Sequence, residues 1–163
     1  MEREWVAEES VVVSAPPERV YEAVADLRRM GEWSPETFAI WTRGRSIGSG
    51  TTFVGFNRAG WRLWFTNCRV TAAEPGRVFA FRVSSFRIPV ALWGYRVEGI
   101  GGGSTRLTEY WEDLRRDGMG ARFISVLGRT VSGVRAERRA GVNREGMRAT
   151  LERIKAAVES RPA

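Results

Sequence analysis

The chain begins with apolar and polar positions arranged as in a β-strand. Residues 4–13 contain Trp5 and a run of valines together with two glutamates. Residues 14–18, Ser-Ala-Pro-Pro-Glu, then offer a polar cap and the prolines that a first helical turn tolerates. Further apolar residues follow at i, i+4 and i+7 (Val20, Val24 and Leu27), which predicts a helix ending near residues 30–31. The Trp-Ser-Pro sequence at residues 33–35 indicates a break and a second short helix.

From about residue 39 to residue 113 the pattern changes to short runs rich in Phe, Trp, Tyr, Val and Thr. We expect strands over residues 50–56, 61–72, 78–83, 92–97 and 105–112. The breaks at residues 57–60, 74–76, 87–89 and 99–103 are rich in turn-forming residues. Connections this short make neighbouring strands antiparallel.

The C-terminal segment returns to helical periodicity. An apolar stripe with helical spacing runs through Val142, Met147, Leu151, Ile154 and Val158. The pattern favours Asn143 as the N-cap of this helix, and Arg-Pro at residues 161–162 marks its end. Phe123 and Leu127 belong to an apolar patch before the helix, in a stretch whose glycines leave its secondary structure open.

This order of elements predicts an α+β architecture with helices packed on one face of an antiparallel sheet. Residues 1–163 contain no internal repeat, low-complexity tract or linker, so we expect a single domain. A long helix on a strongly curved sheet leaves space between the two, and a ligand would bind in that space.

Several short motifs occur in an order and spacing typical of one superfamily. They are VVSAPPERVY at residues 12–21, DL at 26–27, EWSP at 32–35, Val70 with EPGR at 74–77, FAF at 79–81, GSTRLTE at 103–109 and the helix over 143–158. In these motifs the chain resembles the START-like or SRPBCC superfamily, and within it the polyketide cyclase/dehydrase family, over nearly its whole length. The resemblance implies the helix-grip fold, in which a curved antiparallel sheet wraps around a long C-terminal helix, with two short helices after the first strand. It also implies an apolar cavity for a hydrophobic small molecule, without implying an enzyme.

The composition excludes several kinds of catalytic site. The chain has no histidine and a single cysteine, Cys68. Histidine-based triads and dyads, histidine-ligated zinc or haem, and cysteine metal clusters are therefore excluded. We expect no metal and no cofactor, and we expect Cys68 to act as a small apolar residue. Catalysis, if present, would use Asp, Glu, Tyr, Arg, Ser, Thr or backbone groups, or a cofactor that needs no histidine or cysteine ligand.

The net charge of +7 is concentrated toward the C-terminus, because residues 119–163 carry 10 basic and 4 acidic groups. We interpret the cluster of Arg135, Arg138, Arg139, Arg144 and Arg148 as a solvated surface, since no nucleic-acid-binding motif accompanies it. Alternatively, the basic C-terminal third as a whole could dock an acidic carrier protein or an anionic membrane. The chain has no apolar run long enough to span a membrane and no secretory signal, so we expect a cytoplasmic protein without integral membrane association.

Strand alternation predicts which side chains face the cavity. The expected inward residues are largely aromatic, and the last two helical segments add apolar positions. The full expected set of ligand-binding residues is Phe53, Trp64, Phe79, Phe81, Trp93, Tyr95, Leu107, Glu109, Trp111, Phe123, Leu127, Met147 and Leu151. Rings of this kind either fill a core or line a pocket for a flat ligand.

Glu109 and Tyr95 are the candidate catalytic residues. The alternation places the Glu109 carboxyl inward between Leu107 and Trp111. Burial would raise its pKa and suit it to acid–base chemistry. The alternatives are an ion pair with Arg96 or Arg106 at the sheet edge, or a one-residue register slip that puts Tyr110 inside. Tyr95 could orient or protonate a carbonyl oxygen, or be a core tyrosine that bonds to the backbone.

Together these observations favour a binding protein for an aromatic, polycyclic or lipid-like small molecule. The alternative is a polyketide aromatase/cyclase that catalyses aldol closure and loss of water. We expect only one inward carboxylate and no inward arginine, which leaves the acid–base set of such an enzyme incomplete. A homodimer is compatible with the sequence, and specific nucleic-acid binding is not expected.

Overall fold

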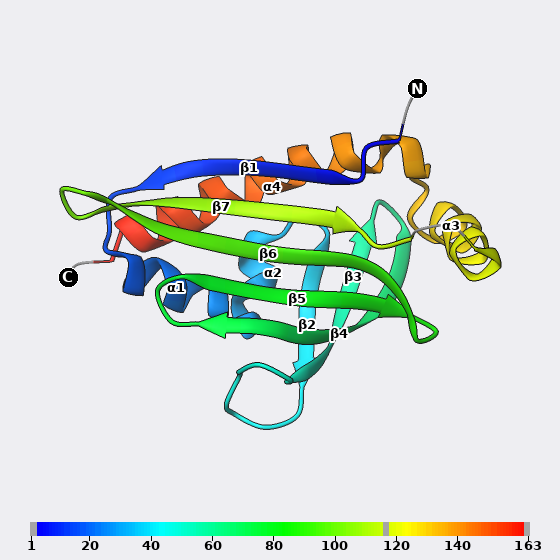
Figure 1. Cartoon of the computed structure of the whole chain (residues 1–163), viewed down its shortest axis with the longest axis horizontal. Helices are drawn as coiled ribbons and strands as arrows, with labels where there is room; N and C mark the ends of the chain where they lie inside the picture. The colour runs from blue at the N-terminus through cyan, green and yellow to red at the C-terminus, as the bar shows by residue number, and fades with distance from the viewer. Residues whose placement is uncertain (1–2, 116–117, 162–163) are drawn as a thin grey trace.

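The computed structural model describes residues 3–115 and 118–161. One antiparallel sheet of seven strands has the order β1-β7-β6-β5-β4-β3-β2. The strands are β1 (Val6–Val13), β2 (Thr37–Thr42), β3 (Thr52–Ala59), β4 (Arg62–Glu74), β5 (Val78–Ser85), β6 (Ile88–Gly101) and β7 (Ser104–Asp113). The helices are α1 (Pro17–Ala25), a 3₁₀ turn (Leu27–Arg29), α2 (Met30–Trp33), α3 (Met119–Ser132) and α4 (Ala136–Glu159). The predicted helix-grip α+β fold is confirmed, with the curved sheet bending around α4 (Figure 1).

Helix α4 lies along the edge strand β1. Arg148 forms an ion pair with Glu9 at 2.8 Å, and Lys155 donates a hydrogen bond to the carbonyl oxygen of Val12 at 2.7 Å. On its other face the predicted apolar stripe is confirmed, because the Met147, Leu151, Ile154 and Val158 side chains are buried in the core. Within the described ranges, no helix is long and apolar enough to cross a bilayer.

The predicted start of the C-terminal helix is wrong. Asn143 is not an N-cap, because α4 begins at Ala136 and Asn143 lies inside it with 3% of its surface exposed. The added turns contain alanine, glycine and charged residues, so hydrophobic periodicity does not reveal them. Val142, which was assigned to the apolar stripe, is 40% exposed.

The first helical region is divided at Asp26. Its side chain accepts a hydrogen bond from the backbone N–H of Arg28 at 3.3 Å, which ends α1 and begins the 3₁₀ turn. The expected second short helix is α2, which ends at Trp33, and the expected break follows it at residues 34–35. The stretch around Phe123 forms α3, which ends at Gly133 in the left-handed conformation with φ 75°.

Gly31 allows α2 to lie close to β2. A Cβ added at Gly31 would lie 2.5 Å from the backbone oxygen of Phe38, so Gly31→Ala must push the helix and strand apart. We expect Gly31→Ala to lower the free energy of unfolding by about 1–3 kcal/mol, measured by urea denaturation. Gly141 in α4 has no atom within 4 Å of the same position, so Gly141→Ala is the matched control. Gly141→Ala should raise the free energy of unfolding by about 0.5–1 kcal/mol, because alanine favours a helix more than glycine does. Equal effects of the two substitutions would contradict the steric argument.

Candidate functional site

A cavity of about 660 Å³ lies between the concave face of the sheet and helices α3 and α4. Its volume is within the range of about 300–1,000 Å³ common for small-molecule sites. The α4 residues that line it all lie between Ala136 and Thr150, so the C-terminal third of the helix is packed against the core without a gap. The α3 residues that line it include Ile124 and Leu127.

The wall on the sheet side is aromatic. Trp111, Trp93 and Phe81 are directly paired across β7, β6 and β5, so their rings form one row across three strands. Phe53 on β3 packs edge-on against Phe81, with 5.3 Å between ring centroids. The cavity is lined by nine of the residues expected from the sequence, namely Phe53, Trp64, Phe81, Trp93, Tyr95, Glu109, Trp111, Leu127 and Met147.

Four expected residues do not line the cavity. Phe79, Leu107 and Leu151 are completely or almost completely buried in the core, where Phe79 packs edge-on against Tyr21 of α1. Their inward orientation was inferred correctly, but α1 and the C-terminal part of α4 fill the space above them. Phe123 is 60% exposed and lies on the outer side of α3.

Glu109 and Tyr95 form a buried pair beside the aromatic row. They are opposite each other on β7 and β6, and the Tyr95 hydroxyl donates a hydrogen bond to Oε1 of Glu109 at 3.1 Å. Burial raises the pKa of Glu109 to about 8, although the bond from Tyr95 lowers it. Burial, and then the proximity of Glu109, raises the pKa of Tyr95 well above its ordinary value. Both groups are therefore mainly neutral at pH 7.

The second carboxyl oxygen of Glu109, Oε2, is buried and has no hydrogen-bond partner among the described residues. Because Oε1 accepts the bond from Tyr95, the neutral acid can donate its own proton from Oε2. The amide nitrogen Nδ2 of Asn143, on the α4 wall, is likewise buried and unpartnered within residues 3–115 and 118–161. A buried polar atom without a partner is costly, and a ligand could supply the missing bonds.

The structure rejects the alternatives that the sequence left open for Glu109. Arg96 pairs with Glu8, and Arg106 pairs with Glu98, so neither neutralises Glu109. The register does not slip, since Tyr110 packs beside Gly94 under the Arg96 guanidinium. Tyr95 bonds to the Glu109 side chain, which differs from the expected alternative of a backbone-bonded core tyrosine.

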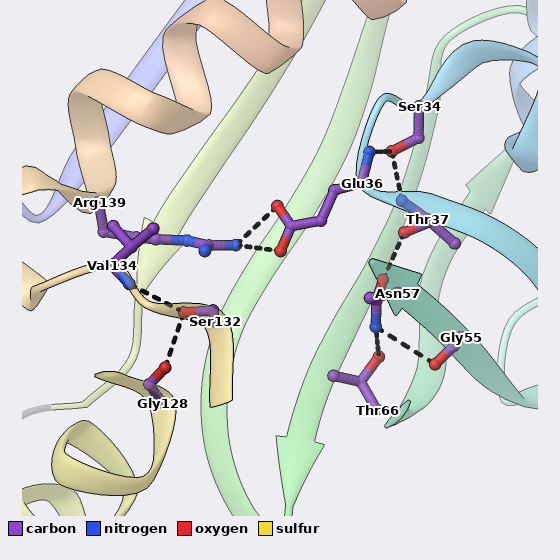
Figure 2. Close-up of polar contacts among 10 residues, drawn as sticks. All are labelled: Ser34, Glu36, Thr37, Gly55, Asn57, Thr66, Gly128, Ser132, Val134 and Arg139. Atoms are coloured by element: carbon purple, nitrogen blue, oxygen red, sulfur yellow. Dashed lines mark hydrogen bonds and ion pairs between the residues drawn. The ribbon is translucent and has the colours of Figure 1, made fainter. Parts of the chain in front are cut away.

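An ion pair between α4 and the start of β2 forms part of the cavity wall. One guanidinium nitrogen of Arg139 lies 2.8 and 2.9 Å from the two carboxyl oxygens of Glu36 (Figure 2). The expectation of one inward carboxylate and no inward arginine is therefore wrong. Glu36 was missed because it lies in the turn before β2, and Arg139 because it was assigned to a solvated surface.

A hydrogen-bonded group around Asn57 lies near this ion pair (Figure 2). Asn57 accepts a bond from the Thr37 hydroxyl at 2.7 Å and donates to the Thr66 hydroxyl oxygen at 3.3 Å. The Ser34 hydroxyl oxygen accepts bonds from the backbone N–H groups of Glu36 and Thr37. These contacts fix the turn that carries Glu36, and they satisfy Asn57 without a ligand.

Arg115 is a second arginine of the cavity wall. It donates two side-chain bonds, at 2.8 and 2.9 Å, to the fully buried carboxylate of Asp113, which Arg3 also contacts at 2.6 Å. Burial would raise the pKa of Asp113, but the bonds from Arg115 and Arg3 outweigh it and hold the pKa below its ordinary value. This site is thus an ionised cluster, in contrast to the neutral Glu109–Tyr95 pair.

Cys68 lines the cavity, and its thiol donates a weak bond to the Thr66 hydroxyl oxygen at 3.7 Å. Burial raises the pKa of Cys68 to about 12, so the thiolate is scarcely populated at neutral pH. A role as nucleophile is therefore unsupported, in agreement with its interpretation as a small apolar residue.

The sequence model of one protein family matches residues 4–159, and the family is described as polyketide cyclase / dehydrase and lipid transport. The chain belongs to this family. The resemblance inferred from the motifs is thereby confirmed. No curated protein matched the sequence.

Solved structures show the same fold. A Polyketide_cyc-like protein from Corynebacterium glutamicum is 31% identical, with a TM-score of 0.63 over 98% of this chain and 94% of that one. The Zhui aromatase/cyclase from a Streptomyces species is 18% identical, with a TM-score of 0.67 over 94% and 93%. The di-domain ARO/CYC protein BexL is 19% identical, with a TM-score of 0.59, and the match covers 96% of this chain and 47% of BexL.

The raised pKa of Glu109 makes the stability of the fold depend on pH. In the folded state Glu109 keeps its proton up to about pH 8, whereas in the unfolded chain it loses the proton near pH 4.5. The free energy of unfolding therefore falls as pH rises between these two values. The chain has no histidine to titrate in this window. The free energy of unfolding of Glu109→Gln should rise relative to that of wild type as pH increases, on the order of 1 kcal/mol per pH unit.

Urea denaturation of both proteins from pH 5.5 to pH 8.5 measures this difference. Glu98→Gln, which alters an exposed carboxylate paired with Arg106, is the control and should follow the wild-type profile. Parallel profiles for Glu109→Gln and wild type would show that Glu109 ionises normally.

Proposed function

We propose that the protein binds a hydrophobic small molecule, aromatic, polycyclic or lipid-like, in the cavity between the sheet and α4. The observation that carries this proposal is the row of Trp111, Trp93 and Phe81 rings along an open cavity of about 660 Å³. Burial of apolar ligand surface against these rings supplies about 25 cal/mol per Å². Offset or edge-on contact with flat rings adds to it.

The polar groups of the cavity would orient the ligand. Oε2 of Glu109 and Nδ2 of Asn143 approach from opposite walls, and each lacks a partner among the described residues. As a neutral acid and an amide N–H, both donate hydrogen bonds, so they favour a ligand with acceptor oxygens. Two arginines of the cavity wall, Arg115 and Arg139, are neutralised by Asp113 and Glu36, so an anionic headgroup would have to compete with these carboxylates to reach them. Arg87 also lines the cavity and has no ion pair within the described ranges.

The second candidate function is an aromatase/cyclase, which one observation favours. Glu109 has a free carboxyl oxygen and a pKa near 8, which suits a group that both gives and takes a proton close to neutral pH. In an aldol closure, the ionised carboxylate would remove a proton from a methylene between two carbonyls. The resulting carbanion would bond to another carbonyl carbon, and the neutral acid would protonate the new alkoxide. Loss of that hydroxyl as water, with a neighbouring proton, gives the double bond.

The binding proposal is tested by filling the cavity from α4. Gly146 lines the cavity, whereas Gly141, on the same helix, has no neighbouring atom within 4 Å of an added Cβ. We expect Gly146→Leu to weaken binding of the uncharged dye N-phenyl-1-naphthylamine about tenfold or more, measured by fluorescence titration. Gly141→Leu should bind the dye like wild type. Equal affinity of all three proteins, or absence of dye binding, would contradict a ligand site in this cavity.

The enzyme candidate is tested with a poly-β-ketone substrate and product analysis by chromatography and mass spectrometry. If Glu109 transfers protons, Glu109→Gln should reduce formation of the cyclised product at least about a hundredfold while dye affinity stays within a few-fold of wild type. Glu98→Gln should leave both unchanged. A product distribution that is the same with and without the protein would leave binding as the function.

A further inference from the structure

Three segments that line the cavity also expose large apolar side chains. The segments are the β3–β4 hairpin (residues 57–66), the β5–β6 hairpin (84–90) and helix α3, which lies at one end of the molecule (Figure 1). We call this surface the rim. Its exposed apolar residues, each at least 60% exposed, are Trp61, Leu63, Phe65, Phe86, Met119, Phe123 and Val126. Leu63, Phe65 and Phe86 also border the cavity itself.

The three segments are in contact with one another. Phe86 of the β5–β6 hairpin packs against Phe123 of α3, with ring centroids 6.4 Å apart. At the other end of α3, the Arg62 guanidinium of the β3–β4 hairpin lies against Gly133 and also stacks on Trp61 at 4.8 Å. Both hairpins therefore contact α3, one near each end of the helix.

Helix α3 is apolar on two sides. Ile124, Leu127 and Val131 line the cavity. Met119, Phe123 and Val126 are spaced i, i+4 and i+7 and lie on the solvent-exposed side of the helix. A surface helix normally has one apolar stripe, which faces the core, so the second stripe indicates a surface that contacts another apolar phase.

The charge of the rim is of one sign. The three segments contain Arg58, Arg62, Arg87, Arg122 and Arg129, and their sequences include no aspartate or glutamate. In the C-terminal arginine cluster, Arg139, Arg144 and Arg148 pair with Glu36, Glu4 and Glu9. Arg135 and Arg138 are exposed and have no ion pair among the described residues. Positive charge that is unpaired in the described part of the chain is therefore present at the rim, and two of its arginines, Arg122 and Arg129 of α3, belong to the basic C-terminal third that the sequence offered as a docking surface.

We propose that the rim docks the protein on the surface of an anionic lipid bilayer, with the segments that line this side of the cavity against the membrane. Arginines beside exposed Trp, Phe and Leu are the combination that binds the interface of anionic membranes. A bilayer accepts apolar side chains protruding from three separate segments, whereas an acidic protein would need a matching pocket for each. Such docking would let an apolar ligand pass between bilayer and cavity with little exposure to water. This inference does not depend on the identity of the ligand.

The test is flotation of the purified protein, without added ligand, with vesicles of phosphatidylcholine alone or mixed with phosphatidylglycerol. Wild type should float with the anionic vesicles at low salt, bind them less at high salt, and bind neutral vesicles far more weakly. Arg87→Gln combined with Arg122→Gln should weaken binding to anionic vesicles about thirtyfold, at about 1 kcal/mol per charge. Trp61→Ser combined with Phe123→Ser should weaken it at least as much.

Matched controls remove the same residue types outside the three rim segments. Arg43→Gln with Arg45→Gln changes the β2–β3 loop, which joins β3 at the end opposite the β3–β4 hairpin. Trp41→Ser removes a tryptophan that is 56% exposed on β2. These controls should bind like wild type. No flotation at low salt, or equal losses in controls and rim variants, would overturn the proposal, as would capture of soluble polyglutamate without any vesicle binding, which would indicate an acidic protein partner.

Discussion

The attachment of α4 to the edge strand β1 determines which part of the molecule is closely packed and which part is hollow. Arg144 and Arg148 hold the helix to Glu4 and Glu9, and Lys155 bonds to the backbone of β1. Because the sheet curves away from this edge, one straight helix cannot cover the whole concave face. From Leu151 onward α4 packs against the core, whereas Asn143 and Met147 in its earlier turns line the cavity. The cavity follows from this geometry, and α3 covers only part of it.

Much of the sheet could be predicted from the sequence because alternation in strands is local. The inward orientation of Phe81, Trp93 and Trp111 follows from strand parity alone, and their pairing across three strands places them in one row. Parity cannot show where an inward residue meets another helix. Phe79 is therefore in the solid core although it shares a strand face with Phe81, which lines the cavity.

The polar part of the site was harder to predict, since it depends on contacts between distant segments. Glu36 and Arg139 are separated by 103 residues and meet only because α4 begins two turns earlier than its hydrophobic pattern shows. The position of Asn143 could have been predicted, because it lies at i, i+4 with Met147 and so shares the buried face of the helix. Asparagine is also a common N-cap, however, and the pattern favoured that interpretation. By contrast, Glu109 could be predicted from the sequence alone. Strand parity places its carboxyl inward, and because the chain has no histidine, a carboxyl is one of the few groups left for acid–base chemistry.

The neutral Glu109 also links ligand binding to proton exchange. A ligand that accepts a hydrogen bond from Oε2 stabilises the protonated acid, so near pH 8 its binding would draw protons from solution. A cationic ligand would favour the carboxylate and release a proton instead. The measured enthalpy of binding would then include the ionisation enthalpy of the buffer, with a sign that reports the charge of the bound group. Near pH 8 the affinity of the cavity for a ligand would therefore depend on pH, with opposite signs for hydrogen-bond acceptors and for cations.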